Sequence, residues 1–168
     1  MHLRSACESD LSIIISWIAD ADDCKLWAGP HVSFPLSSET LKAQISYAPE
    51  NSFCLEKDGE VVAFGQLIPK DRQRLHLARI IVNPAEREKG LGQILCEQII
   101  ARAVDQSCRW ITLNVYENNV AAMNLYKHLG FEAMPPPAEE LPSEEVCFLA
   151  ISVNDTFGSQ CEKTNGSQ

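Results

Sequence analysis

Six consecutive residues in the middle of the chain combine glycines with cationic side chains: Arg87-Glu88-Lys89-Gly90-Leu91-Gly92. Because glycine has no Cβ, the backbone here can approach a ligand closely and point its N–H groups outward. A helix-like segment follows, and the first turn of a helix adds unpartnered N–H donors and a positive dipole end. This combination is typical of a phosphate or pyrophosphate site. A plain glycine-containing loop is equally compatible, and the spacing is neither GxGxxG nor a P-loop.

A second set of spaced residues follows further along the chain: Asn119, Ala122, Leu125, Tyr126 and Gly130-Phe131. Asparagine is a preferred N-cap, so Asn119 or its neighbour Asn118 is expected to begin a helix. Tyr126 then falls on the inward face of that helix. From its position alone it is a packed core residue, with Leu125 and Leu129 beside it.

Hydropathy periods predict the elements that position these two sets. Helical spacing indicates helices at 11–18, 38–48, 90–104 and 120–129. Leu26 to Pro30 is interpreted as a loop that leaves a helix. Alternating or continuous apolar runs indicate strands at 52–56, 60–67, 75–82, 109–116 and 146–153, with a hairpin turn at Lys57-Asp58-Gly59 and a solvated loop over 135–145.

The strand–helix–strand unit over residues 75–116 predicts a crossover that joins two parallel strands. Together with the hairpin, this unit predicts a mixed α/β sheet. We expect one domain over residues 1–153. Residues 154–168 are polar and are expected to be disordered.

Three linked motifs resemble the GNAT superfamily of acetyl-CoA-dependent N-acetyltransferases. They are Leu77-Ala78-Arg79-Ile80-Ile81-Val82-Asn83-Pro84, Arg87-x-x-Gly-x-Gly92 and Asn119-x-x-Ala-x-x-Leu-Tyr126-x-x-x-Gly-Phe131. They occur in the family's order over residues 75–131, and the rest of the chain resembles the family only in layout. The resemblance implies an α/β fold of the α+β type, with a mixed, mostly antiparallel sheet, a central parallel strand pair and helices on both faces. It also implies an acyltransferase that moves the acetyl group of acetyl-CoA to a primary amine.

The resemblance further implies which residues hold acetyl-CoA. In the family, the strand before the glycine loop offers backbone groups to the pantetheine arm, and the loop amides hold the pyrophosphate. An asparagine at the start of the following helix and a tyrosine further along that helix contact the cofactor in the family. Carried over by position, the cofactor-binding residues are Ile80, Ile81, Val82, Arg87, Glu88, Lys89, Gly90, Leu91, Gly92, Asn119 and Tyr126.

Two catalytic roles follow from the same resemblance. Tyr126 matches the general acid that protonates the departing CoA thiolate, and a phenol of pKa about 10 can protonate a thiolate of pKa about 8.5 in contact with it. Many relatives carry a glutamate as base six residues before the position of Val82, where this chain has His76. An imidazole of pKa about 6.5 can take a proton from an ammonium, directly or through water. A packed strand histidine is an equal alternative, so the base stays open.

Amine acceptors are usually cationic, so an acidic or aromatic entrance would attract them. Asp20, Asp22, Asp23 and Trp27 lie in the region that lines the acceptor side in the family. For each carboxylate the alternative is a solvated helix end. Asp22, Asp23 and Trp27 are the predicted substrate-side residues.

Composition narrows the possible partners. The 168 residues include 14 basic and 23 acidic ones, a net charge of −9 that repels a phosphate backbone, so we expect no nucleic-acid partner. No apolar run is long enough to span a membrane, and no leader is evident at the N-terminus. Seven cysteines occur without a CxxC pair, so we expect no metal and a reducing compartment, the cytoplasm.

Three functions stay open on the sequence. The first is acetylation of a small amine, such as a polyamine, amino sugar or amino acid derivative. The second is acetylation of a protein N-terminus or lysine, and the third is a non-catalytic acyl-CoA-binding sensor. Tyr126 argues against the sensor, whereas His76 in place of the glutamate favours it. The amine acceptor is not identified, and we expect a monomer or a homodimer.

Overall fold

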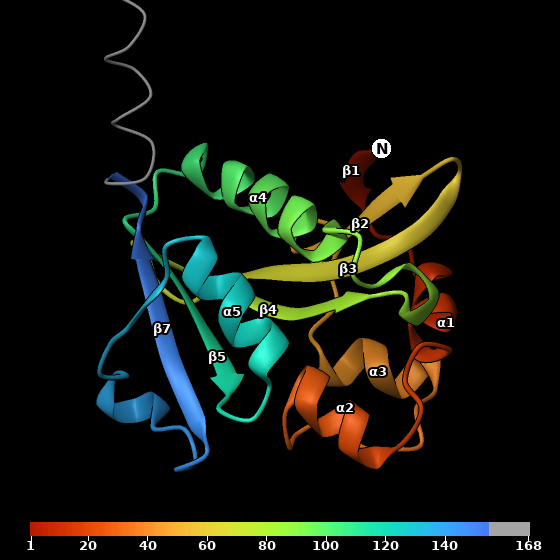
Figure 1. Ribbon diagram of the computed structural model, residues 1–168, viewed down its shortest axis with the longest axis horizontal. Coiled ribbons are helices and arrows are strands. Elements are labelled where there is room, and N and C mark those ends of the chain that lie inside the picture. The colour runs from red at the N-terminus through yellow and green to blue at the C-terminus, as the bar shows by residue number, and fades with distance from the viewer. Residues whose placement is uncertain (155–168) are drawn as a thin grey trace, which may run out of the picture. The chain divides into compact units, whose positions relative to one another are not determined.

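The computed structural model describes residues 1–154, so the tail predicted over 154–168 lies outside the described residues except for Asn154. The described residues form a seven-stranded sheet in the order β1-β2-β3-β4-β5-β7-β6 (Figure 1). β4 and β5 pair in parallel, and the sheet is otherwise mostly antiparallel. The predicted α/β fold with a central parallel strand pair is therefore confirmed.

The described chain divides into two compact units. The first unit comprises Met1–Ile68 and Leu77–Ala101, and the second comprises Pro69–His76 and the chain from Arg102 onward. The strand β4 (Arg74–Val82) begins in the second unit and continues into the first.

The first unit begins with three antiparallel strands, β1 (His2–Ser5), β2 (Ser52–Lys57) and β3 (Glu60–Pro69). The predicted hairpin is confirmed. Asp58 and Gly59 between β2 and β3 have φ values of 52° and 83°, and a two-residue hairpin turn of type I′ requires positive φ at both positions. The strand β1 was not predicted from the sequence. This strand has only four residues and mixed polarity, so its alternation is too short to stand out.

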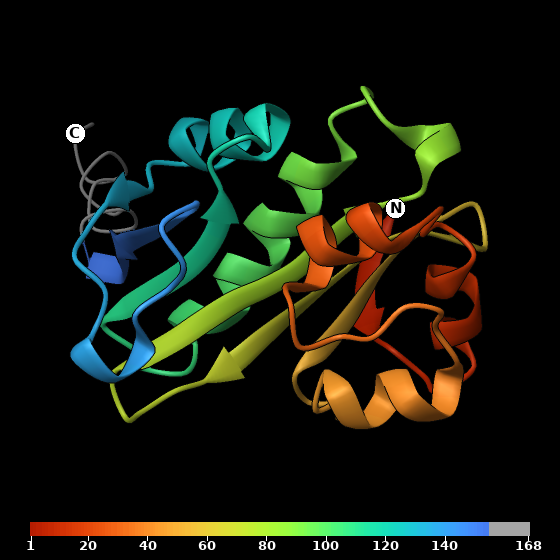
Figure 2. The same cartoon turned by 90° about the horizontal axis from the view of Figure 1, so that it is seen from below.

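Helices lie on both sides of these strands: α1 (Asp10–Ile15), α2 (Ala21–Ala28), α3 (Ser38–Gln44), the 3₁₀ turn η1 (Pro84–Glu86) and α4 (Leu91–Val104). α4 lies along one face of β2 and β3, and α2 and α3 lie on the other side (Figure 1). Turning the molecule by 90° shows α2 beside β4 (Figure 2). The predicted helices at 38–48 and 90–104 are confirmed, with α3 ending earlier than expected.

The apolar stripe predicted for residues 11–18 is buried although α1 ends at Ile15. Trp17 N–H and Ile18 N–H donate to carbonyls only three residues back, so tight turns continue the chain inward after the helix. On the opposite face, Gly65 allows close packing of α4. A Cβ at Gly65 would lie 2.5 Å from Ile80 Cδ1 and 2.9 Å from Ile99 Cδ1, so the ends of these two side chains would have to shift to admit it.

The loop predicted from Leu26 to Pro30 is wrong, because α2 extends through Ala28. The acidic residues explain the helix. Asp20 caps it by accepting the Asp23 N–H at 2.9 Å, and carboxylates in the first turn favour the positive end of the helix dipole. The loop begins only at Gly29, where φ reaches 79°.

The second unit contains β5 (Trp110–Tyr116), α5 (Val120–His128), β6 (Glu132–Ala133), the 3₁₀ turn η2 (Ala138–Glu140) and β7 (Val146–Ser152). β7 is antiparallel to both β5 and β6, and Ile111, Leu113 and Leu149 are fully buried. The predictions for β5, α5 and β7 are confirmed within a residue. The two-residue β6 was missed.

The loop predicted as solvated over 135–145 is partly held by an ion pair. Glu140 in η2 makes two hydrogen bonds with the guanidinium of Arg74, one of them 3.0 Å long from Nη1 to Oε2. This pairing, with Arg74 as the main cause, lowers the pKa of Glu140. The acidic loop is therefore attached to the start of β4.

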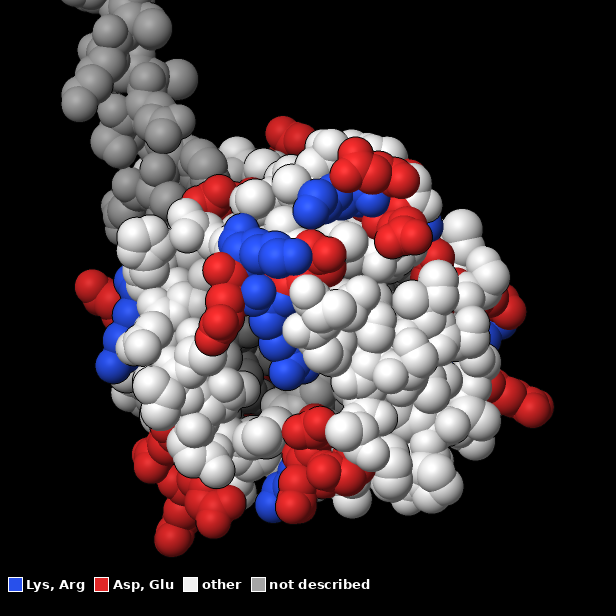
Figure 3. All heavy atoms as spheres, turned by 45° about the vertical axis from the view of Figure 1, so that its right-hand side comes forward, with Lys and Arg blue, Asp and Glu red and all other residues white. Residues whose placement is uncertain are grey.

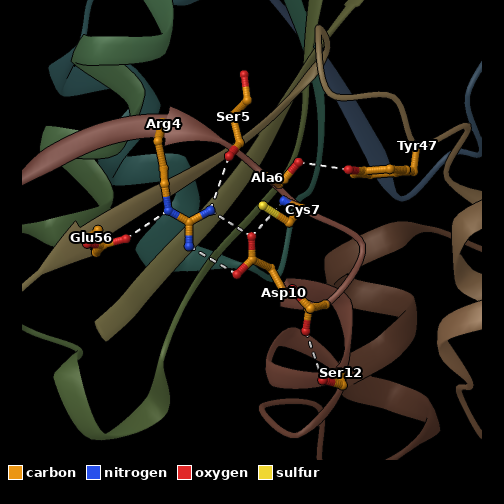
Figure 4. Close-up of polar contacts among 9 residues, drawn as sticks. Arg4, Ser5, Ala6, Cys7, Asp10, Ser12, Tyr47 and Glu56 are labelled. Carbon is orange, nitrogen blue, oxygen red and sulfur yellow. Dashed lines mark hydrogen bonds and ion pairs between the residues drawn. The ribbon is translucent and has the colours of Figure 1, made fainter. Parts of the chain in front are cut away.

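An ionic cluster joins β1, β2 and the start of α1 (Figure 4). Arg4 donates to Asp10 through both terminal nitrogens, at 2.7 and 3.1 Å, and through Nε to Glu56 at 2.8 Å. The buried Asp10 carboxylate also accepts the Cys7 N–H at 2.7 Å. Burial alone would raise the pKa of Asp10, but the hydrogen bonds from Arg4 and Cys7 outweigh it and lower the pKa.

We expect Asp10→Asn to destabilise the protein at neutral pH by about 2 kcal/mol, because it weakens a charged hydrogen-bond pair inside the fold. The folded pKa of Asp10 is lowered, so its contribution is present above the unfolded pKa of about 4 and is lost as the pH falls further. Melting temperatures measured between pH 7 and pH 3 should therefore decline less in the variant than in the wild type.

The control is Glu8→Gln, since Glu8 pairs with Lys42 on the exposed surface. It should cost about 0.5 kcal/mol or less at pH 7. Equal acid sensitivity in the wild type and Asp10→Asn would contradict the role given to Asp10.

None of the helices in residues 1–154 is long and apolar enough to cross a membrane.

Candidate active site

The predicted pyrophosphate loop lies between η1 and α4 in the first unit. Asn83 starts η1 by accepting the Ala85 N–H at 3.0 Å. Glu88 and Gly90 then take left-handed conformations, with φ values of 63° and 76°, and α4 begins at Leu91. A Cβ at Gly90 would meet no atom within 4 Å, so the space in front of this glycine is open. The first N–H groups of α4 have no carbonyl partner within the helix.

The charges of this loop are partly neutralised. Lys89 Nζ lies 3.1 Å from Glu86 Oε2, and Lys57 Nζ lies 3.4 Å from the same oxygen. The hydrogen bond from Lys89 is the main reason that the pKa of Glu86 is lowered. On the face drawn in Figure 3, acidic side chains lie among the basic ones. Anion binding in the loop would therefore depend on its N–H groups and on the exposed Arg87 more than on Lys89.

α2 is joined to β4 just before the predicted pantetheine strand. Trp27 Nε1 donates to the Arg79 carbonyl at 2.9 Å, and the indole packs edge-on against Phe64 with centroids 6.5 Å apart. Arg79 itself has a φ of 54°, so the strand bends at this residue. Ile80, Ile81 and Val82 follow directly, and the side chain of Ile81 is buried.

The predicted acidic acceptor residues take part in starting α2. Asp23 Oδ2 accepts the Ala19 N–H at 3.4 Å, and Asp22 is exposed in the first turn. Asp23 and Trp27 are four residues apart on α2 and so share one face of it. The role of Asp22, Asp23 and Trp27 toward an acceptor stays a prediction.

His76, the predicted base, is buried near the start of β4 in the second unit. Its exposed fraction is 8 %, and it pairs in register with Thr112 of β5. His76 Nδ1 lies 2.9 Å from Thr112 Oγ1, and Arg74 Nη1 lies 3.3 Å from the same hydroxyl. If His76 donates its Nδ1–H to Thr112, the basic lone pair of the ring is on Nε2.

Tyr126, the predicted acid, lies on α5 and is also 8 % exposed. Its ring packs edge-on against Phe131, with centroids 6.0 Å apart. Asn119 begins the same helix, because its side chain accepts the Ala122 N–H at 3.4 Å. This bond confirms the capping role expected of Asn119, and its contact with a cofactor stays a prediction.

Three polar residues that organise these strands were not predicted from the sequence: Gln66, Arg79 and Thr112. Gln66 is fully buried and donates to Ile45 O at 3.2 Å and to Ser52 Oγ at 3.0 Å. Each of the three interrupts an apolar strand segment. Because a buried polar group must find partners, such interruptions were the available signal.

Residues 1–154 contain no group of three or more His, Cys, Asp or Glu side chains arranged to hold a metal ion.

Residues 15–131, more than half of the chain, match the Acetyltransferase (GNAT) family. The chain belongs to that family, as the three sequence motifs predicted. The matched region is accordingly an acetyltransferase domain of GNAT type.

Curated relatives cover shorter segments. A UPF0039 protein of Schizosaccharomyces pombe is 31% identical over 75 residues, which are 45% of this chain and 49% of that protein. The chain thus matches about half the length of this relative. The spermine/spermidine N(1)-acetyltransferase of Bacillus subtilis is 27% identical over 111 residues, with 53% of this chain and 73% of that protein covered.

Solved structures share the fold over nearly the whole length. The spermidine N-acetyltransferase of Vibrio cholerae, in complex with CoA and spermine, has a TM-score of 0.74 at 18% identity and covers 92% of this chain and 96% of its own. The ribosomal-protein-alanine N-acetyltransferase of Brucella melitensis has a TM-score of 0.71 at 17% identity, and the match covers 90% of this chain and 99% of that chain. At these identities the likeness concerns the fold.

Proposed function

We propose that this protein transfers the acetyl group of acetyl-CoA to the primary amine of a small molecule. The observation that carries the proposal is the left-handed Gly90 at the start of α4, with open space in front of it. A group that has two phosphates and a long arm fits such a loop, because the loop follows directly on a strand that can extend along the arm.

Acetyl-CoA supplies an activated thioester carbonyl. The amides from Arg87 to Gly92 would hold its pyrophosphate, and the backbone of Ile80 to Val82 would pair with its pantetheine arm. A Cβ at residue 90 would project into the open space, so the loop as it stands fits the group. No cationic side chain has to supply the whole of the binding energy, since helix N-termini bind anions through their N–H groups.

The chain's own residues would then move two protons. The amine nitrogen forms a bond to the acetyl carbon as the carbon–sulfur bond breaks. His76 would accept the proton that the amine releases, directly or through water. Tyr126 would donate its phenolic proton to the departing sulfur. Thr112 would orient the imidazole through its contact with Nδ1.

A small amine acceptor is the first choice because a relative of 27% identity is named a spermine/spermidine N(1)-acetyltransferase. The fold likeness to a ribosomal-protein-alanine N-acetyltransferase keeps a protein N-terminus as the second candidate. A sensor without turnover is the third.

One experiment separates these candidates. Calorimetry with acetyl-CoA tests binding, and release of the CoA thiol is then followed over a panel of small amines and over peptides with free N-termini. Turnover of small amines alone supports the proposal, and turnover of peptides alone supports the second candidate. Binding without turnover of either supports the sensor, and no binding of acetyl-CoA would overturn the proposal.

We expect His76→Gln to change the pH dependence of turnover more than the stability of the fold. A base works in its neutral form, so the rate of the wild type should fall as the pH drops and the imidazole becomes protonated. Glutamine keeps the size and a contact with Thr112 but cannot titrate, so the acidic limb of the pH–rate profile should flatten while the rate at the plateau drops. An unchanged limb in His76→Gln would assign the base to another group or to a water chain.

A further inference from the structure

We propose that the guanidinium of Arg79 binds a carboxylate of the acceptor, so that the acceptor is an amine with a carboxylate close by, as in an amino acid, and not a polyamine. This inference rests on the proposed function, because it concerns the acceptor of that reaction.

Arg79 is held in a fixed position in the first unit. Its φ of 54° bends β4, and its carbonyl accepts the Trp27 indole N–H at 2.9 Å. Its Nη1 donates to Gln66 Oε1 at 2.8 Å. Gln66 is in turn fixed by the Ile45 carbonyl and Ser52 Oγ. A left-handed arginine inside a strand costs energy and indicates a site that the surrounding structure maintains.

The charge of Arg79 is not balanced within the described residues. The arginines Arg4 and Arg74 each bind carboxylates, whereas no carboxylate of residues 1–154 forms an ion pair with Arg79, and its Nε is buried without a hydrogen-bond partner. Burial lowers the pKa of Arg79, with no neighbouring charge to oppose it. A half-buried cation with only a neutral amide for a partner is costly. An anionic ligand would offset that cost with charge-assisted hydrogen bonds.

The position of Arg79 along β4 fits the acceptor. The proposed pyrophosphate loop follows the C-terminal end of β4, and the pantetheine arm would run back along Val82, Ile81 and Ile80. The reacting end of that arm then comes to the residue before Ile80, which is Arg79. An acceptor amine must approach this same end.

The positive charge of Arg79 also favours some amine acceptors over others. A polyamine carries several positive charges, and an unbalanced guanidinium beside its binding site would repel it. A carboxylate in the acceptor would instead accept two parallel hydrogen bonds from the planar guanidinium. Asp20 and Asp23 keep their negative charge while they accept backbone N–H groups at the start of α2, so a polyamine would be attracted there and repelled at Arg79, and the comparison with spermidine decides between the two effects.

The test compares amino acids with their amides, which keep the amine and lose the carboxylate, and with spermidine. For the wild type we expect kcat/KM for the best amino acid to exceed that for its amide by about tenfold to hundredfold, the effect of one charged hydrogen-bond pair. In Arg79→Gln this ratio should fall toward one. Arg102→Gln, which removes an exposed arginine, should keep the ratio of the wild type.

Two further measurements make the result decisive. Calorimetry with acetyl-CoA tests the proposed function separately. If the wild type did not bind acetyl-CoA, the proposed function itself would fail. With acetyl-CoA bound, a preference for spermidine or for amides, or an unchanged acid-to-amide ratio in Arg79→Gln, would overturn the inference, as would the absence of turnover with every amino acid. The melting temperature of Arg79→Gln should equal or exceed that of the wild type, whereas a structural arginine would make it fall.

Discussion

Tyr126→Phe is expected to reduce turnover by roughly a hundredfold to ten-thousandfold, the range typical of losing a general acid. Tyr126 is buried and its ring packs edge-on against Phe131. Phenylalanine keeps that ring and its packing, so the fold and the affinity for acetyl-CoA should be retained. What is removed is the proton that the departing thiolate needs, and the loss should therefore appear in kcat.

A matched control for this substitution is Tyr47→Phe. The Tyr47 hydroxyl donates to the Ala6 carbonyl at 2.7 Å, so the control removes a partly buried hydrogen bond worth about 1 kcal/mol. It should lower stability slightly and keep turnover. If Tyr126→Phe turned over at the rate of the wild type on the true acceptor, Tyr126 would be a core residue and the acid would have to be sought elsewhere.

The central elements could be predicted because each has a clear period and a clear end. β4 is a run of apolar residues stopped by Asn83-Pro84, and α4 follows a glycine pair. The parallel pairing of β4 with β5 followed from the crossover between them, and the register His76 with Thr112 bears it out. Long-range topology was accessible here because one helix of ordinary length joins the two strands.

The N-terminal region was predicted less well for a physical reason. Short elements are specified by packing more than by pattern, so the four residues of β1 gave no usable alternation. For α2 the sequence left two roles open for the acidic residues, an acceptor entrance and a solvated helix end. Asp20 and Asp23 satisfy backbone N–H groups at and before the helix start, as the second role expects, and the role toward an acceptor stays a prediction.

The residue roles could be only partly predicted, because side-chain partners come from distant segments. Arg79 occurs within the motif that identified the family, yet its bent backbone and its bond to Gln66 appear only when β3 and β4 lie together. The same holds for Thr112, which reaches His76 across the parallel pair. A motif identifies the chemistry, whereas the strand register determines which polar side chains assist it.

Gly90→Ala should weaken acetyl-CoA binding by about tenfold or more, since an added Cβ would obstruct charged hydrogen bonds from the loop to the pyrophosphate. Space inside the fold does not limit this substitution, because the Cβ would meet no atom within 4 Å. The cost to folding comes from the φ of 76°, which L-residues other than glycine rarely adopt, and it amounts to about 1 kcal/mol. Calorimetry with acetyl-CoA measures the first effect, and thermal melting measures the second.

Gly59→Ala separates the two effects. Gly59 has a φ of 83° and equally open surroundings, but it lies in the hairpin turn between β2 and β3. Its alanine variant should therefore lose a similar amount of stability and keep the acetyl-CoA affinity of the wild type. If the two variants bound acetyl-CoA equally well, backbone strain would be the whole effect of Gly90→Ala, and the pyrophosphate would have to bind away from the start of α4. A selective loss in Gly90→Ala would instead assign the open space before α4 to the phosphates, because stability and backbone conformation are matched between the two glycines.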